Sequence, residues 1–407
     1  MALSIRRFQS GTGERFATLV DEEGMPLFYP TLYTTAVLRG ASLSINTIIN
    51  ALGAIKMLCA WESYYGISVE SRFKRSELLL AHEIHSLRDF MQKPMADTRQ
   101  REGKVVPIKG KLKRVSKANQ YNRLTVAAGY MDFIAGRLHP VTASSANDIA
   151  AMVAQIKASR PKMASKIEND RSTVHLEDAL LNLVEDVIKP GSAANPVREY
   201  GLQMRNALMF TLLRHTGMRR GELLNLKIED FDFAMGTVKI VRRADSADDP
   251  RNYQPLAKTR ERTFPLIPEL MDKIRLYIEK WRNKVPGARK HGYLFVTHRP
   301  GKSLGWPLSG SGFGKFMETL AGIADGASKL HAHALRHHWN YVFSKRCEEQ
   351  GLTPEAEENT RSYLMGWSET SGTAATYNKR HIKEAAAQAV IGLQNKHFGR
   401  AANELHK

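Results

Sequence analysis

Apolar residues in the first 160 positions mostly recur every three or four residues, which is the period of an α-helix. The clearest example covers residues 42–65, where the apolar face consists of Ile45, Ile48, Leu52, Ile55 and Cys59. Gly66 follows, and glycine commonly ends a helix. The same period predicts helices over residues 76–91, 119–137 and 144–159. We therefore expect a helical domain over residues 36–160.

The first 35 residues have a different pattern. Two short apolar runs, residues 16–20 and 26–29, flank an acidic turn that ends at Gly24. This arrangement predicts a β-hairpin extension over residues 1–35. The hairpin could contact a ligand or brace the next helix, and its few basic side chains favour bracing.

The second half of the chain is also mainly helical. Helical periodicity predicts helices over residues 176–188, 197–215, 268–281, 309–323, 333–347, 354–365 and 382–398. Two runs, residues 236–241 and 258–266, predict paired strands around a long polar loop. Thr353 and Pro354 suit the cap and the first position of a helix. The predicted fold is mainly α with a small antiparallel sheet, in two domains, with a polar linker at residues 161–174 before the domain of residues 175–407.

Composition narrows the partners. Lys and Arg number 60 and Asp and Glu 41 in 407 residues, so the net charge is +19, which favours a polyanion such as nucleic acid. Charge alone does not separate a DNA-binding protein from a basic protein of another kind. The two cysteines, Cys59 and Cys347, form no zinc-type spacing and are expected to be core thiols in a reducing compartment. We expect no membrane span, since no apolar run approaches ~18 residues, and no secretion signal.

Basic residues crowd into residues 98–123. The candidate DNA contacts are Arg99, Arg101, Lys111, Lys113, Arg114 and Lys117. Pro107 and Gly110 favour a loop, which could be a solvated linker or an arm that binds phosphates. The chemistry described next favours the arm.

Four late segments carry residues suited to phosphoryl transfer. These residues are Arg219, His333, Arg336, Trp367 and Tyr377. Arginine forks bind phosphate oxygens in pairs, and a phenol can attack phosphorus if a base and cationic groups surround it. Such a set needs no metal. A metal site built from His331, His333 and His337 lacks a completing carboxylate or cysteine.

The order Arg, Lys, His-x-x-Arg, Gly-Trp and Tyr resembles the tyrosine recombinases, or phage-type integrases. The resemblance covers the last half of the chain by motif and the first half only by helix pattern. It implies a helical core-binding domain and an α-rich catalytic domain. It also implies that Arg219 and Arg336 clamp the scissile phosphate, with Glu222 supporting Arg219.

The remaining roles follow from the same resemblance. His333 would donate to a phosphate oxygen or accept the phenol proton, and Trp367 replaces the commoner histidine and can only donate. Tyr377, ten residues after Trp367, would be the nucleophile. Tyr363 belongs to an amphipathic helix and is expected to be a core residue. Lys258 would protonate the leaving 5′ oxygen, although its spacing to the following proline is one residue short. Arg260 is the alternative, but arginine is a poor proton donor.

The resemblance implies a site-specific recombinase or integrase, acting through a 3′-phosphotyrosyl intermediate without cofactors. Its expected partners are double-stranded DNA, further copies of itself in a homotetramer on two DNA sites, and a directionality factor. A mobile element and the nucleoid of a bacterial cytoplasm are the expected setting. Two alternatives remain: relaxation of DNA in the manner of a type IB topoisomerase, and a catalytically silent DNA-binding protein. The helix of residues 382–398 is expected to pack on its own domain or on a neighbouring copy.

Overall fold

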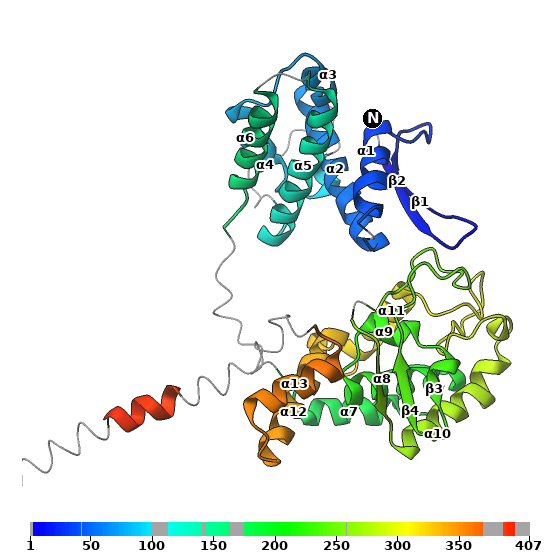
Figure 1. Cartoon of the computed structure of the whole chain (residues 1–407). Coiled ribbons are helices and arrows are strands. Elements are labelled where there is room, and N and C mark those ends of the chain that lie inside the picture. Colours follow the sequence, from blue (N-terminus) through cyan, green and yellow to red (C-terminus); the bar gives the residue numbers. More distant parts are fainter. Residues whose placement is uncertain are drawn as a thin grey trace, which may run out of the picture. The chain divides into compact units, whose positions relative to one another are not determined.

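The computed structural model describes residues 3–41, 43–98, 113–140, 144–162, 175–257, 259–368 and 386–394. The chain forms two compact units, Met1–Ser165 and Lys166–Lys407 (Figure 1). Each unit has its own core of buried apolar side chains. The predicted fold class is confirmed, since helices dominate both units and the sheets are small and antiparallel.

The first unit opens with a hairpin of β1 (Ser4–Gln9) and β2 (Arg15–Val20). Phe8 stacks on Phe16 across the pair, with ring centroids 5.5 Å apart. The prediction of a strand at residues 26–29 was wrong, because only Pro26 pairs with β2 and the helix α1 (Phe28–Tyr33) follows. Proline has no N–H for a strand ladder, but it fits the first turn of a helix, where Pro30 lies.

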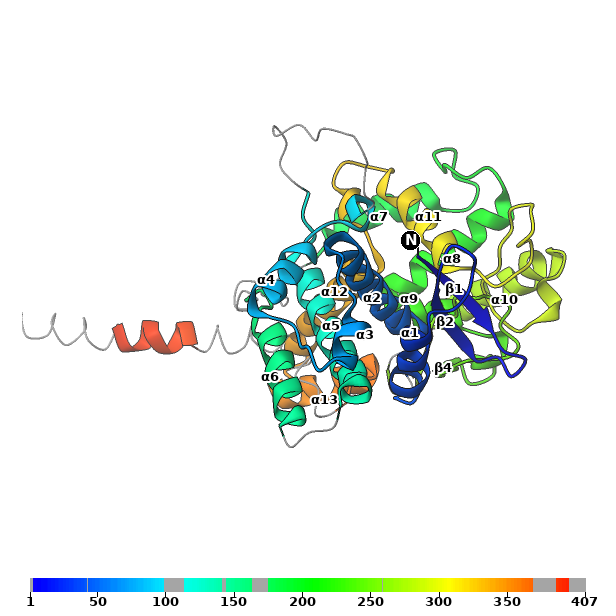
Figure 2. The same ribbon diagram turned by 90° about the horizontal axis from the view of Figure 1, so that it is seen from above.

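Helices build the rest of the first unit. They are α2 (Ile45–Tyr65), α3 (Val69–Lys74), α4 (Ala81–Phe90), α5 (Lys117–Leu138) and α6 (Ser145–Ala158). The long helix α5 packs against α2 and α6 (Figure 2). The predicted helix over 76–91 starts later than expected, because Ser76 adopts a φ of 63° that no right-handed helix accepts.

The second unit is arranged around α8 (Tyr200–Thr216), which packs against α7 (Asp178–Ile188), α9 (Arg220–Asn225) and α12 (Ala332–Glu349). The remaining helices are α10 (Pro268–Leu276), α11 (Gly310–Ala321) and α13 (Pro354–Met365). A wider helical turn continues α10 to Trp281, as the apolar pattern predicts. The Thr353 hydroxyl accepts a hydrogen bond from the N–H of Ala356, so the predicted helix cap is confirmed.

The small sheet of this unit has the order β3 (Phe231–Asp232), β4 (Thr237–Ile240), β5 (Arg262–Pro265). Its strands are antiparallel, and Ile240 pairs with Arg262. The long connection from β4 to β5 is fixed to the core by Arg251, which donates to the carbonyls of Leu224 and Leu308. This connection therefore joins the end of α9 to the start of α11.

Residues 386–394 are helical and their side chains are exposed. The other residues of the predicted helix over 382–398 lie outside the described ranges. Among the residues that the structure describes, no helix has both the length and the apolar character needed to cross a bilayer.

Candidate active site

Arg219 lies at the junction of α8 and α9. Gly217 ends α8 with a φ of 61°, and a Cβ there would lie 2.9 Å from the Trp339 ring, so the turn requires glycine. The backbone N–H of Arg219 donates to Glu222 Oε2 (3.0 Å), which caps α9. The Arg219 Nη1 lies 3.5 Å from Glu222 Oε1, and one third of the side chain is exposed. The carboxylate thus orients the guanidinium while leaving part of it at the surface.

Arg336 reaches the same junction from α12. Its side chain is buried, and Nη1 donates to the Gly217 carbonyl at 2.7 Å. Nη2 donates to the Met365 carbonyl at 3.3 Å. The guanidinium carbon lies 5.5 Å from the centre of the Trp367 ring, within the range of a cation–π contact.

The Met365 carbonyl is the point at which the predicted motifs meet. Arg219 Nη1 lies 3.5 Å from this oxygen, so both guanidiniums reach the same acceptor. Helix α13 ends here, because Gly366 adopts a φ of 62° and the backbone N–H of Trp367 donates to the Ser362 carbonyl. The structure therefore brings together four of the predicted residues: Arg219, Glu222, Arg336 and Trp367.

The buried carboxylate of Glu222 lies close to the two arginines, Arg219 and Arg336. Glu222 is 1% exposed and accepts from Thr259 Oγ1 (2.6 Å) and from Arg262 Nη2 (2.8 Å). Burial raises the pKa of Glu222. The charge of Arg262, its hydrogen bond, the charge of Arg336 and the Thr259 hydrogen bond together outweigh burial, so the net shift is downward. Glu222 therefore stays ionised between these arginines.

Arg262 is a supporting residue that the sequence analysis missed. It lies on β5, is buried, and its Nε donates to the Leu364 carbonyl at 2.6 Å. It therefore ties β5 to both α9 and the end of α13. Strand alternation offered a clue, since Arg262 falls on the same buried face as Phe264, where an unpaired charge would be costly.

Gly366 brings α13 and the β5 segment into close contact. The N–H of Arg260 donates to its carbonyl at 3.0 Å. A Cβ at Gly366 would lie 2.9 Å from the Arg260 carbonyl oxygen, from Arg262 Nη1 and from Thr259 Cβ. The position of Met365 and Trp367 relative to Arg262 thus depends on glycine here.

A cavity of about 380 Å³ opens beside Trp367, where Arg260, Ser362 and Tyr363 are among the lining residues. Tyr363 is 60% exposed, so the expectation that it is a core residue was wrong. Its hydroxyl instead donates to the Thr263 carbonyl at 3.1 Å, which lays the ring along the edge of β5.

The histidines separate into two kinds. His333 is exposed in the first turn of α12, and its ring centre lies 4.2 Å from that of His337. His337 and His338 are buried. His331 caps α12 by accepting from the N–H of Ala334. Within the described ranges, no three His, Cys, Asp or Glu side chains are grouped so as to hold a metal ion.

Several predicted residues lie outside the described ranges, among them Lys258 and Tyr377. The same is true of Arg99, Arg101 and Lys111 in the basic stretch. The other three candidate DNA contacts are exposed: Lys113 and Arg114 just before α5, and Lys117 at its first residue.

Comparison with known proteins finds a family match that spans the candidate site. Residues 194–382 match the model of the phage integrase family, and the match includes every predicted catalytic residue. Over these residues, which are less than half of the chain, the protein is similar to the phage integrase family. The integrase domain so defined contains Arg219, Arg336 and the turn at Gly366.

The chain is also similar to curated tyrosine recombinases. Tyrosine recombinase XerD of Halalkalibacterium halodurans is 28% identical over 172 residues, which cover 42% of this chain and 50% of the relative. XerD of Staphylococcus saprophyticus is 27% identical over 248 residues, covering 58% of this chain and 73% of the relative. The chain spans about half the length of most of these curated relatives.

Two solved structures share low sequence identity with the chain. The XerH site-specific recombinase bound to its difH substrate is 17% identical with a TM-score of 0.40, covering 88% of this chain and 93% of that one. The Tn1549 transposon integrase in complex with transposon right end DNA is 17% identical with a TM-score of 0.37, covering 68% and 89%.

Proposed function

We propose that the chain is a site-specific DNA recombinase that cleaves and rejoins DNA through a 3′-phosphotyrosyl intermediate. The observation that carries the proposal is the Met365 carbonyl, a single oxygen that both Arg219 and Arg336 reach. Two guanidiniums that can share one oxygen are close enough to grip one phosphate. The match of residues 194–382 to the integrase family supports this use of the site.

The charges around the site suit a phosphodiester in transition. Arg219, Arg262 and Arg336 surround one carboxylate, Glu222, so the site has an excess of positive charge. Negative charge spreads over the phosphate oxygens during transfer, and preorganised donors stabilise it most strongly where water is excluded. The contacts to Met365 are longer than the usual ~2.7–3.2 Å of N–H···O hydrogen bonds, so a phosphate oxygen would compete with this carbonyl on favourable terms.

The proposed reaction conserves a phosphodiester linkage throughout. The phenol oxygen of Tyr377 attacks phosphorus, the bond to the 5′ oxygen breaks, and the 3′ phosphate becomes esterified to the tyrosine. His333 would accept the phenol proton, because the Trp367 N–H can only donate. Lys258 would give a proton to the departing 5′ oxygen. The 5′ hydroxyl of a second DNA then reverses the attack, so the cycle needs no cofactor and no ATP.

The wider setting forms part of the same proposal. We place four copies of the chain on two double-stranded DNA sites, with a directionality factor selecting integration or excision. We place the protein at the nucleoid of a bacterial cell and assign it to a mobile element. One of the similar structures is named as a transposon integrase, and only this name bears on the assignment.

A nicked suicide substrate tests the proposal. It loses the short fragment that carries the 5′ hydroxyl, so cleavage should trap the protein on DNA. When a second duplex with a free 5′ end is added, the trapped strand should join to it. Covalent trapping with relaxation of supercoiled plasmid but no joining between two sites would favour a topoisomerase, and no trapping at all would favour a silent DNA-binding protein.

A further inference from the structure

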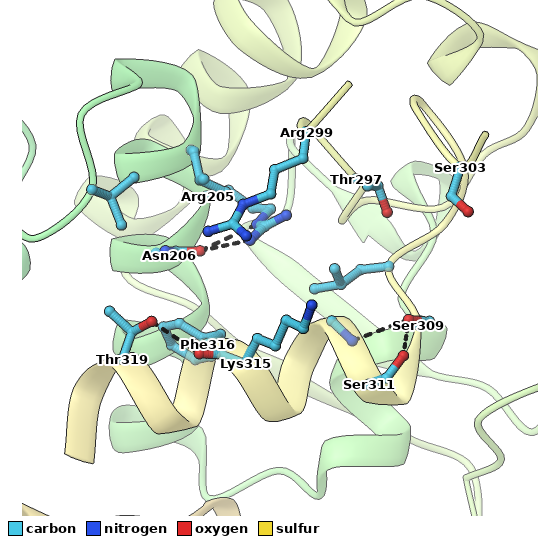
Figure 3. A pocket seen from close by; sticks show the side chains of 14 residues that line it. Arg205, Asn206, Thr297, Arg299, Ser303, Ser309, Ser311, Lys315, Phe316 and Thr319 are labelled. Carbon is cyan, nitrogen blue, oxygen red and sulfur yellow. Dashed lines mark hydrogen bonds between the residues drawn. The ribbon is translucent and has the colours of Figure 1, made fainter. Parts of the chain in front are cut away.

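A second cluster of cations lies at a cavity away from the candidate active site. The cavity holds about 240 Å³ and is formed by the first turns of α8, the segment around Thr297, and the start of α11. Figure 3 shows the side chains of Arg205, Arg299 and Lys315 converging on it from these three segments. We refer to it as the cationic cavity.

The floor of the cationic cavity is formed by a buried side chain that hydrogen bonds hold in place. Arg205 is 6% exposed, and its guanidinium is held by Asn206 Oδ1 (2.8 Å from Nη2) and by the Val296 carbonyl (3.0 Å from Nη1). Both acceptors are neutral. Burial lowers the pKa of Arg205 to about 10; Tyr277 and Glu199 oppose this shift, and the positive charge of Arg299 adds to it. Arg205 and Arg299 are therefore close enough to repel each other.

Nothing that lines the cavity offsets this repulsion. None of the 14 lining residues, all within the described ranges, is Asp or Glu. Glu199, whose charge partly opposes the lowered pKa of Arg205, is not a lining residue and contacts His298 Nδ1 at 3.3 Å. The polar lining consists of an amide and hydroxyls, including those of Ser309 and Ser311 at the N-terminus of α11. Hydroxyl and backbone donors at a helix start add to the attraction for an anion.

We propose that the cationic cavity binds a phosphate group of the DNA backbone, at a point away from the cleaved bond. The inference rests on the proposed function, which makes DNA the partner. A phosphate would neutralise three converging cations that have no acidic counterpart in the lining. The volume suits a phosphate group with several waters, since one water occupies about 30 Å³.

Helix α8 relates the cationic cavity to the active site. Arg205 lies 12 residues before Gly217, whose carbonyl binds Arg336. Because each residue of an α-helix rises about 1.5 Å, this separation is about 18 Å along α8. The cavity therefore lies well away from the candidate active site along α8, so a phosphate held there would not be the cleaved one.

The test compares two matched double variants of the full chain. Arg299→Gln with Lys315→Gln removes two exposed cations from the cavity and leaves the buried Arg205 in place. Arg289→Gln with Lys290→Gln removes the same two charges from an exposed turn outside it. Binding of a fluorescent duplex of mixed sequence is measured by anisotropy over a range of salt concentrations. Loss of one phosphate contact should reduce the slope of log K against log salt by about 0.9.

We expect the cavity variant to bind DNA about tenfold more weakly at low salt, with the smaller slope, while the control variant stays near wild type. Equal losses in both variants would show a general charge effect and would overturn the proposal. A second arm measures thermal unfolding with added inorganic phosphate at constant ionic strength. If phosphate stabilises wild type more than the cavity variant while their DNA binding is equal, the cavity binds an adventitious ion only, and the proposal also fails.

A third measurement separates this proposal from the proposed function. At saturating duplex, the cavity variant should form the covalent adduct on a nicked suicide substrate to the wild-type extent. If wild type forms no adduct but the cavity variant still shows the smaller salt slope, recombinase activity is refuted and the phosphate site stands. If adducts form and the salt slopes of wild type and cavity variant are equal, the function stands and the phosphate site is refuted.

Discussion

Arg219 and Arg336, which come from different helices, both approach the carbonyl oxygen of Met365, at 3.5 and 3.3 Å. Arg219 is separated from Met365 by 146 positions in the sequence, and Arg336 from Met365 by 29. The turn after α13 thus fixes the distance between the two guanidiniums. The proposed phosphate clamp depends on this shared acceptor.

Conservative changes at the two arginines test their role as a clamp. Arg219→Lys and Arg336→Lys keep the charge but lose the planar fork, so each should slow cleavage by roughly 100-fold or more with DNA affinity nearly unchanged. Single-turnover cleavage of a nicked substrate measures the rate. Arg220→Lys is the matched control, because Arg220 is the exposed neighbour, and it should cleave at close to the wild-type rate. Equal rates in all three variants would contradict the clamp.

The close approach at Gly366 can be separated from its backbone conformation. Gly366→Ala should destabilise the protein through both a positive φ and the contacts of a Cβ at 2.9 Å with the Thr259–Arg262 segment. Gly351 has a similar φ of 67° but nothing within 4 Å of its Cβ position, so Gly351→Ala should cost only the backbone term of about 1–2 kcal/mol. Urea unfolding should show a larger loss for Gly366→Ala, accompanied by slower cleavage. Equal losses of stability in the two variants would mean that the Thr259–Arg262 segment moves to accommodate the Cβ at no cost in free energy.

Much of this arrangement was predictable from local sequence. Periodicity predicted α13, and its cap at Thr353 needs only residues that are neighbours in the chain. The strand assigned to residues 26–29 failed because α1 begins at Phe28, so only Pro26 pairs with β2, and β1 is the strand partner of β2. Competition between partners of this kind depends on three-dimensional packing, which periodicity does not contain.

The site was predictable in its residue types but not in its contacts. The motifs pointed to Arg219, Arg336 and Trp367, yet the acceptor that joins the arginines is a backbone carbonyl, and every residue has one. Arg262 was missed for a related reason. Its partners, Glu222 and the Leu364 carbonyl, lie 40 and 102 positions away, and no short motif links them.

The buried Glu222–Arg262 pair gives a prediction for stability. Glu222→Gln keeps the shape but leaves Arg262 buried without its counter-charge, which should cost about 3–5 kcal/mol. Adding Arg262→Met should recover part of this loss, because the unpaired charge is then removed. Urea unfolding of the single and double variants measures the coupling. Additive losses would show that the two side chains do not depend on each other.

His298 predicts a pH dependence in the second unit. Burial, aided by the charge of Arg205, lowers its pKa from 6.5 to about 4. The unfolded chain therefore binds a proton between these values that the folded chain does not. Stability should be full above pH 6.5 and fall as the pH drops toward 4, by up to about 1.4 kcal/mol per pH unit. His298→Gln can keep the contact with the Tyr277 hydroxyl and should flatten this part of the curve. An unchanged slope in that variant would assign the dependence to other groups.

The most direct measurement of the central claim is the covalent adduct itself. Wild-type protein, Tyr377→Phe and the control Tyr363→Phe are incubated with a labelled nicked substrate and separated on a denaturing gel. Tyr377→Phe lacks only the attacking oxygen, so it should bind the DNA normally and give no adduct, while wild type and Tyr363→Phe should both give one. An adduct that persists in Tyr377→Phe, or no adduct in wild type, would contradict the account.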